Sequence, residues 1–485
     1  MKKLTLFFLL LLLFTGCQQP ESEAGKNYSE DIEKIEQGLL PSILIEGEEV
    51  EPMTIEERMA HYKVPGVSIA FFENGDIQWT RTYGYLSNDS LQAVDENTRF
   101  QAASISKPVA GSGVLTLVEQ ENLDPDADVN TYLQEWKMPE NGFTESEKVT
   151  LRGLLTHNAG LTVHGFRGYA ADEAVPTTVQ VLNGENPANS APILPDTFPG
   201  AIWRYSGGGY TVMQRLVEEM NGDAFPEFMQ TAVLSPVGMK NSTYAQPLPA
   251  SLHDNTANGH RGDGSPVEGK WHTYPEMAAA GLWTTPSDLA RWALAVQKAY
   301  NGAEDRFISP ETARRMLSKH ANDWGLGPAL GGEADSLWFS HGGSNEGYKC
   351  YLFAFAKTDG QGVAIMTNGD RGGNLYGEIL RSVSKVCAWN QFEPEVKKVI
   401  PMNAKKKEEY TGLFKANEQW QIRLTVEGDE LRAVQLWNQQ PSVLYPDSTD
   451  RFFDIGDGTA LRFFRKEGGE IEGFEVQGYR FEKEE

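Results

Sequence analysis

The sequence has few cysteines and a marked shortage of positive charge. It contains three cysteines in 485 residues, and 43 lysines and arginines against 68 aspartates and glutamates, so its formal net charge is −25 at pH 7. Nucleic acids and anionic lipid surfaces attract cationic proteins, so neither is expected as the main partner. So few cysteines exclude a disulfide framework, and the scattered histidines show no zinc-ligand spacing. We therefore expect no metal and no cofactor.

Long apolar runs are also scarce, and the one near the start of the chain is short. It covers residues 4–14 and follows two lysines. Eleven residues are too few to span a bilayer as a helix, and a basic start with a short apolar core is typical of a secretory signal, here residues 1–16. Thr15-Gly16-Cys17 resembles a bacterial lipobox, which implies lipidation of Cys17 and an exported, membrane-anchored lipoprotein facing the periplasm or the cell surface. The alternative is ordinary cleavage and release.

Length and composition predict two or three folded domains. The apolar fraction of 40% and the charged fraction of 23% are those of a globular protein with a sizeable core. Residues 17–50 are polar and charged, which suggests a lipid-anchored tether leading into a first helix. We then expect a main domain over residues 51–390, a lysine-containing linker over 391–407 and a small β domain over 408–485. With Cys17 lipidated, Cys350 and Cys387 remain, and the sequence does not decide whether they form a disulfide.

The patterns in the main domain predict an α+β fold. Residues 66–85 read as a β-hairpin around Asn74-Gly75, the strongest two-residue turn signal. Residues 348–368 read as a second strand pair, and a helix between the two pairs begins after Thr285, its expected N-cap. We expect an antiparallel sheet flanked by helices. In the tail, short alternating strands, including a hairpin around Gly468-Gly469, predict a small antiparallel sheet or barrel.

The first chemical signal is Ser104, three residues before Lys107. On a helix these residues share a face, and Pro108 is tolerated only in a first turn, so the helix should begin close to Ser104. A serine hydroxyl needs a base, and a lysine serves if burial and the positive helix end lower its pKa. The alternative is an ordinary serine beside a solvated lysine.

Two later motifs add weight to this pair. Tyr205-Ser206-Gly207 lies in a glycine-rich loop before an amphipathic helix, and the tyrosine could move protons near Ser104. His341-Gly342-Gly343 precedes a strand, where glycines allow the close approach of a ligand and the N–H of Ser344 could face an oxyanion. Taken singly, a tyrosine or a histidine is more often structural.

Together the three motifs resemble the serine β-lactamase and penicillin-binding-protein superfamily, in its class C β-lactamase-like branch, peptidase family S12. The surrounding text, such as TRFQAASISKPVAG and MAAAGLWTTPSDLARW, is similar too, and the resemblance covers about residues 55–390. It implies the fold of that superfamily, and the tail resembles the lipocalin-like β domain of some members.

The resemblance also implies roles for the motif residues. Ser104 would be the acylated nucleophile, Lys107 its partner base, Tyr205 the proton carrier and His341 the third-motif residue near the substrate. The backbone N–H groups of Ser104 and Ser344 would form the oxyanion hole. The glycines of the second and third motifs would line the substrate; they are Gly207, Gly342 and Gly343.

The chain departs from the family pattern at two positions. Gly207 stands where an asparagine is usual, and His341 replaces the lysine of true class C β-lactamases. Both changes favour peptidase-like or esterase-like members over efficient antibiotic hydrolysis. We therefore expect a serine hydrolase of small peptide-like substrates, with peptides that contain D-amino acids among the candidates. An esterase on the same site and a non-catalytic protein that binds cell-wall fragments are the alternatives.

Overall fold

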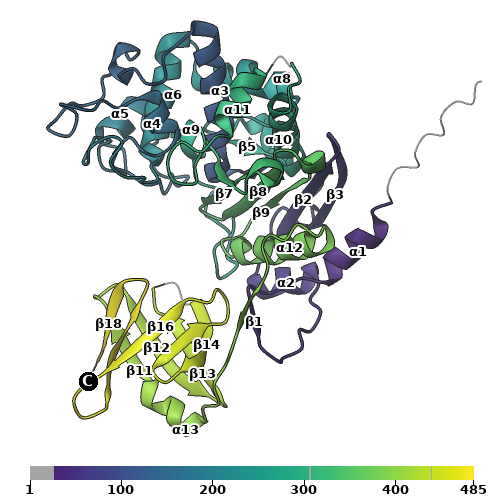
Figure 1. Ribbon diagram of the computed structural model, residues 1–485, viewed down its shortest axis with the longest axis vertical. Coiled ribbons are helices and arrows are strands. Elements are labelled where there is room, and N and C mark those ends of the chain that lie inside the picture. Colours follow the sequence, from purple (N-terminus) through teal and green to yellow (C-terminus); the bar gives the residue numbers. More distant parts are fainter. Residues whose placement is uncertain (1–26, 305–306, 438–439, 485) are drawn as a thin grey trace, which may run out of the picture.

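An antiparallel sheet forms the centre of the larger domain. The computed structural model describes residues 27–304, 307–437 and 440–484. The predicted signal segment and Cys17 lie outside these residues. The six strands of the sheet are ordered β3-β2-β9-β8-β7-β6 (Figure 1). Their bounds are β2 Gly66–Glu73, β3 Asp76–Gly84, β6 Ala329–Gly331, β7 Trp338–Asn345, β8 Tyr348–Phe355 and β9 Gly362–Thr367.

The two predicted strand pairs are confirmed, and they pair with each other. Asn74 and Gly75 form the turn between β2 and β3, both with positive φ angles of 53° and 81°. Val67 in β2 lies opposite Thr367 in β9, so strands from opposite ends of the domain are direct neighbours. The α+β prediction for this domain is correct.

One face of the sheet is covered by helices from both ends of the domain. They are α1 Ser29–Gln37, α2 Ile55–Tyr62 and α12 Gly372–Val386 (Figure 1). Ile32 and Ile35 of α1 are buried in the same cluster as residues of α12 and β2. Within residues 17–50, the segment predicted as a tether leading into a first helix, the described part forms α1 and β1. A narrow apolar stripe in a charged segment is enough to fold the helix onto the sheet.

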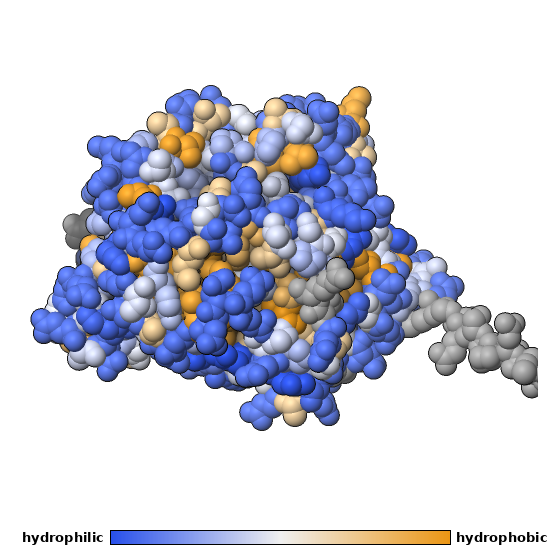
Figure 2. Space-filling model, turned by 90° about the horizontal axis from the view of Figure 1, so that it is seen from above, coloured by the Kyte–Doolittle hydropathy of each residue, from blue (hydrophilic) through white to orange (hydrophobic). Residues whose placement is uncertain are grey.

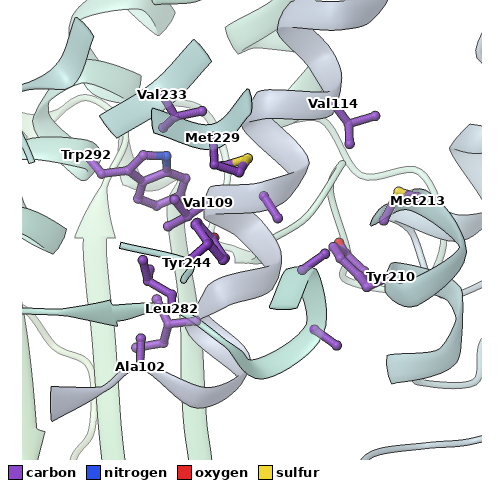
Figure 3. Close-up of a cluster of buried hydrophobic side chains, with 14 of the residues drawn as sticks. Ala102, Val109, Val114, Tyr210, Met213, Met229, Val233, Tyr244, Leu282 and Trp292 are labelled. Atoms are coloured by element: carbon purple, nitrogen blue, oxygen red, sulfur yellow. The ribbon is translucent and has the colours of Figure 1, made fainter. Parts of the chain in front are cut away.

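The opposite face carries the helical region that holds α3 Ser106–Glu121. Apolar side chains from α6 Gly207–Asn221, α7 Phe225–Met229 and α10 Pro286–Tyr300 pack around this helix; they include Tyr210, Met213, Met229 and Trp292 (Figure 3). As predicted, Thr285 caps α10, accepting from the backbone N–H of Asp288. The other helices are α4 Leu151–Leu155, α5 Thr178–Asn183, α6 Gly207–Asn221, α7 Phe225–Met229, α8 Ser235–Val237, α9 Met277–Ala280, α10 Pro286–Tyr300 and α11 Pro310–Met316. A two-stranded sheet joins β4 Phe100–Gln101 to β5 Trp283–Thr284.

The C-terminal region is a closed antiparallel barrel of eight strands, β11 to β18. Their bounds are β11 Gly412–Lys415, β12 Gln421–Glu427, β13 Glu430–Gln435, β14 Gln440–Ser448, β15 Arg451–Asp454, β16 Ala460–Arg465, β17 Ile471–Val476 and β18 Tyr479–Lys483. β11 pairs with both β12 and β18, which closes the sheet and leaves no edge. Aromatic side chains fill much of the interior; they include Tyr410, Phe452, Phe463 and Phe474.

The segment predicted as a linker, residues 391–407, contains two short elements. They are β10 Glu395–Lys397 and α13 Ala404–Lys407. β10 forms a parallel ribbon with β1 Ile43–Ile45, so a strand from the N-terminal segment lies beside the connection between the two domains (Figure 1). Viewed from above, the surface is mostly hydrophilic, with separate apolar patches between (Figure 2). No helix among the described residues is long and apolar enough to cross a membrane.

Candidate active site

A strained turn presents Ser104 at the junction of β4 and α3. Ala103 has a positive φ of 48°, a conformation that non-glycine residues rarely adopt. It opens a single 3₁₀ turn, Ala103–Ile105, that leads into α3. The buried Cys350 thiol donates to the Ala102 carbonyl oxygen at 3.0 Å and supports the turn from β8. Cys350 and Cys387 form no disulfide, which answers the question left open by the sequence.

Ser104 and Lys107 meet as the sequence spacing predicts. Lys107 Nζ lies 3.0 Å from Ser104 Oγ and donates to the Ala279 carbonyl oxygen in α9 at 2.8 Å. The lysine is buried, with 2% of its surface exposed. Burial disfavours the ammonium form and lowers the pKa of Lys107 to about 7. A large part of the lysine population is therefore neutral near pH 7 and can accept a proton.

Tyr205 lies on the same cluster, just before α6. Its ring is 4.9 Å from Lys107 Nζ, measured to the ring centroid. Burial raises the pKa of Tyr205, and a hydrogen bond with Ser104 opposes that shift only in part. The phenol therefore stays protonated at neutral pH and can donate a proton.

His341 completes the cluster as a neutral imidazole. Burial, and to a smaller extent the charge of Lys107, lower the pKa of His341 to about 3. Its Nδ1 lies 2.6 Å from the Gly342 carbonyl oxygen, so Nδ1 donates and Nε2 is the acceptor that faces Tyr205 Oη at 3.5 Å. The histidine thus brings no positive charge to this position of the third motif.

Aromatic rings hold Tyr205 in place. The His157 ring lies 4.2 Å from the Tyr205 ring, and the Trp324 ring lies 5.9 Å from it. His157 Nδ1 accepts from the Ser206 backbone N–H at 3.1 Å, which fixes the ring beside the second motif. These contacts join segments far apart in the chain, so no local sequence pattern predicts them.

The third motif lies on strand β7, which runs beside the turn that carries Ser104. β6 pairs with β7 only as far as Ser340, so within the described chain the outer edge of β7 is unpaired from His341 onward. Asn345 at the end of β7 donates to the Gln101 side chain at 2.7 Å and so ties the strand to β4. Ser344 lies on the exposed part of this edge. Its oxyanion role, like the substrate role of Gly207 at the start of α6, stays a prediction.

The two glycines of the third motif differ in the space around them. A Cβ added at Gly343 would collide with the Ala102 carbonyl oxygen and the Cys350 sulfur, whereas one added at Gly342 would meet only the Tyr351 ring, at 3.5 Å. Gly343 therefore allows β7 to approach the Ser104 turn closely. Gly342 contributes its backbone, while its Cβ direction leads to the other face of the sheet.

Gly343→Ala is therefore expected to lower kcat/KM by about 100-fold, because it pushes β7 away from the nucleophile. Gly342→Ala, one residue away, is expected to stay close to wild type. Steady-state kinetics of the two variants on the same substrate would check this. Equal losses of kcat/KM in both variants would contradict the close approach of β7 to the Ser104 turn at Gly343.

A buried carboxyl group, Glu276, was missed at the sequence level. It directly precedes α9, the helix whose Ala279 carbonyl accepts from Lys107. The side chain is fully buried, and neither carboxyl oxygen has a hydrogen-bond partner among the described residues. Burial raises the pKa of Glu276 to about 8. A lone glutamate in an otherwise apolar sequence segment looks like a surface residue, so only the structure reveals it.

Glu276→Gln is expected to change how stability depends on pH. The folded protein keeps the proton of Glu276 up to about pH 8, whereas the unfolded chain loses it above pH 4.5. The free energy of unfolding therefore falls as pH rises between these values, by on the order of 5 kcal/mol, and glutamine removes this loss. Urea unfolding of both proteins at pH 5 and pH 9 measures it. An equal decline in wild type and variant would refute the assignment.

The fold and the serine–lysine–tyrosine cluster are those of the β-lactamase and transpeptidase-like class of serine hydrolases. The sequence matches the Beta-lactamase family model over residues 53–383. The chain belongs to the Beta-lactamase family.

Curated relatives are distant. Protein flp of Staphylococcus aureus strain MW2 is 24% identical over 65% of this chain and 61% of its own length. The chain thus spans about three fifths of the length of that relative. Penicillin-binding protein 4* of Bacillus subtilis strain 168 is 23% identical over 82% of this chain and 92% of its own length.

Solved structures share the fold. The octameric penicillin-binding protein homologue from Pyrococcus abyssi has a TM-score of 0.61 and 20% identity, and the match covers 88% of this chain and 98% of that one. The D-amino acid amidase from Ochrobactrum anthropi SV3 has a TM-score of 0.55 and 18% identity, over 68% and 97% of the two chains.

Proposed function

We propose that this protein is a serine hydrolase that forms an acyl-enzyme at Ser104 and cleaves amide or ester bonds of small peptide-like substrates. The observation that carries the proposal is the 3.0 Å contact between Ser104 Oγ and the buried amine of Lys107. The amine has its pKa lowered to about 7, near the value at which a general base works best at neutral pH.

In the acylation step, Ser104 Oγ attacks the substrate carbonyl carbon while Lys107 Nζ takes the hydroxyl proton. The negative charge that develops on the carbonyl oxygen is held by backbone N–H groups, for which Ser104 and Ser344 are the candidates. Collapse of the tetrahedral intermediate breaks the bond to the leaving group, which takes a proton from the Tyr205 hydroxyl. Tyr205 regains a proton from Lys107, which lies beside its ring.

In the deacylation step, a water molecule attacks the acyl-enzyme and its proton passes to the same base. The product acid leaves, and Ser104 Oγ recovers its proton. The opposite pKa shifts of Lys107 and Tyr205 support the lysine as the base and the tyrosine as the proton donor. Since all steps use side chains of this chain, the proposal invokes no cofactor.

The charge of the third motif bears on the substrate class. His341 is neutral, so the third motif offers no fixed cation for a carboxylate beside the scissile bond. This favours amides, esters or peptides that are neutral at that position. The name of the structurally similar D-amino acid amidase supports D-amino acid amides as the first substrates to try. We also propose that Cys17 is lipidated and that the enzyme works outside the cytoplasm, tethered to a membrane.

Intact-mass labelling tests the proposal. The chain from residue 18 is incubated separately with a fluorophosphonate and a fluorescent penicillin, beside Ser104→Ala. We expect one adduct per chain, lost in the variant. Penicillin labelling would indicate a cell-wall type of substrate, whereas labelling by the fluorophosphonate alone would favour the esterase alternative. A folded protein that reacts with neither probe would overturn the proposal of a serine hydrolase and would favour the alternative of a non-catalytic binding protein.

A further inference from the structure

The C-terminal barrel is open at one end. Because neighbouring strands run antiparallel, the turns β11–β12, β13–β14, β15–β16 and β17–β18 all lie at this end. A cavity of about 430 Å³ lies there, within the range of small-molecule sites. Closed barrels of eight strands can hold one small ligand at such a mouth. Below it, Phe414, Phe463 and Phe474 pack together, so the cavity is a pocket and not a channel.

Three aromatic residues form the rim of this pocket and remain in contact with solvent. Trp420, Trp437 and Tyr479 are 38%, 44% and 52% exposed. The Trp420 ring lies 4.9 Å from the Tyr479 ring and 6.4 Å from the Trp437 ring. Exposed single aromatics are common, but three that cluster around Trp420 at the mouth of a cavity offer a wide apolar surface for a ligand.

Polar side chains of mixed type also line this pocket. Asp454 is partly buried, and its carboxylate accepts from the Gly456 backbone N–H at 2.7 Å and from Ser442. Thr459 and the Gln477 amide also line the cavity and contact each other at 3.5 Å. Among the described residues, no lysine, arginine or histidine lines it. The pocket thus combines two carboxylates, Asp454 and Asp457, with hydroxyl and amide groups, and its described lining holds no cation.

We propose that this pocket binds a short, uncharged oligosaccharide. A pyranose ring presents an apolar C–H face, which packs flat on an aromatic ring, and a rim of hydroxyls that both donate and accept. That pattern matches the aromatic rim and the polar wall. An anionic ligand would meet Asp454 with no cation to offset it, and a purely apolar ligand would bury the polar wall without hydrogen bonds.

The mouth lies at the end of the barrel that contacts the hydrolase domain's N-terminal segment. The Ser42 hydroxyl donates to the Gly456 carbonyl oxygen in the β15–β16 turn, and Ile43 packs against Gly458 in the same turn. α13 lies at the other end, where Lys407 donates to the Asp429 carbonyl oxygen. A glycan held in the pocket would therefore sit on the hydrolase side of the barrel (Figure 1).

Titration of the folded chain with defined sugars tests this proposal. Cellotetraose and N-acetylchitotetraose are added while tryptophan fluorescence is recorded, with tetragalacturonate as the anionic control. We expect saturation by at least one neutral sugar with a Kd of about 1 mM or tighter and none by the anionic one. Trp420→Ala is expected to weaken binding at least tenfold. Tyr445→Ala, on the outer face of the barrel, should leave it unchanged.

A second readout separates loss of binding from loss of folding. Fluorophosphonate labelling of Ser104 should be the same in wild type and both barrel variants. Gln477→Ala, a smaller change in the lining of the pocket, should weaken the affinity for the sugar at least threefold. No saturation by either neutral sugar, or equal binding by Trp420→Ala, would overturn the proposal. Saturation by tetramethylammonium alone would also overturn it, because it would mark a cation site.

Discussion

Ser104→Ala is expected to lower turnover by at least about 10⁴-fold while leaving the fold intact. In the proposed mechanism the Ser104 hydroxyl forms the acyl-enzyme, and removal of a nucleophile in related serine chemistry leaves only the contribution of binding and the oxyanion site. Ser104 is only half-buried, and its hydroxyl contacts Lys107 and Tyr205. Its loss therefore creates no buried unpartnered group of any size. Initial rates on an activated ester, normalised to active folded protein, measure the effect.

The second serine of the same motif provides the matched control. Ser106 is buried, and its hydroxyl accepts from the Leu282 backbone N–H at 3.0 Å. Ser106→Ala should destabilise the fold by about 1–3 kcal/mol, because it leaves that N–H without a partner, but it should still be acylated. If Ser106→Ala abolished labelling in a folded protein and Ser104→Ala did not, the nucleophile would have been assigned to the wrong serine.

Lys107→Met is expected to lower kcat/KM by about 10²- to 10⁴-fold, the usual contribution of a general base. Methionine fills a similar volume and needs no proton, so the buried site should accept it without loss of stability. In the wild type, kcat/KM should rise about tenfold per pH unit up to roughly pH 7 and then level, because only the neutral amine accepts the Ser104 proton.

Lys107→Arg distinguishes a base from a fixed charge. A guanidinium stays protonated at every working pH, so this variant should be as slow as Lys107→Met and its rate should not level near pH 7. Measurement of kcat/KM from pH 5 to pH 9 for the three proteins decides the matter. A Lys107→Arg enzyme with near-normal rates would show that the residue acts through its charge, and Tyr205 would then become the candidate base.

Local patterns predicted much of the fold. The hairpin at Asn74-Gly75, the cap at Thr285 and the short alternating strands of the tail each depend on neighbouring residues, and each is present. The path of residues 29–45 was not predictable in this way. α1 folds because Ile32 and Ile35 meet α12, more than 300 residues later in the chain, and a single sequence carries no signal for such a distant partner.

The candidate site also combines contacts that local patterns predict with contacts that depend on distant parts of the chain. Ser104 and Lys107 are three residues apart on one chain segment, so their contact follows from helix geometry. The approach of Tyr205 and His341 was expected only from the family resemblance, and the structure brings both to the cluster. The supporting contacts, such as the His157 ring on Tyr205 and the buried Glu276 before α9, depend on tertiary packing, so no local pattern could reveal them.

The parallel ribbon of β1 and β10 makes the two domains interdependent. The barrel follows the hydrolase domain in sequence, but the strand that joins them is paired with a strand from the beginning of the chain. Removal of everything after residue 391 would leave β1 with an open hydrogen-bonding edge and uncover Ile43, which is buried in the intact chain. We therefore expect that the barrel cannot be removed without affecting the hydrolase domain. The truncated domain would expose an unpaired strand edge, which favours self-association.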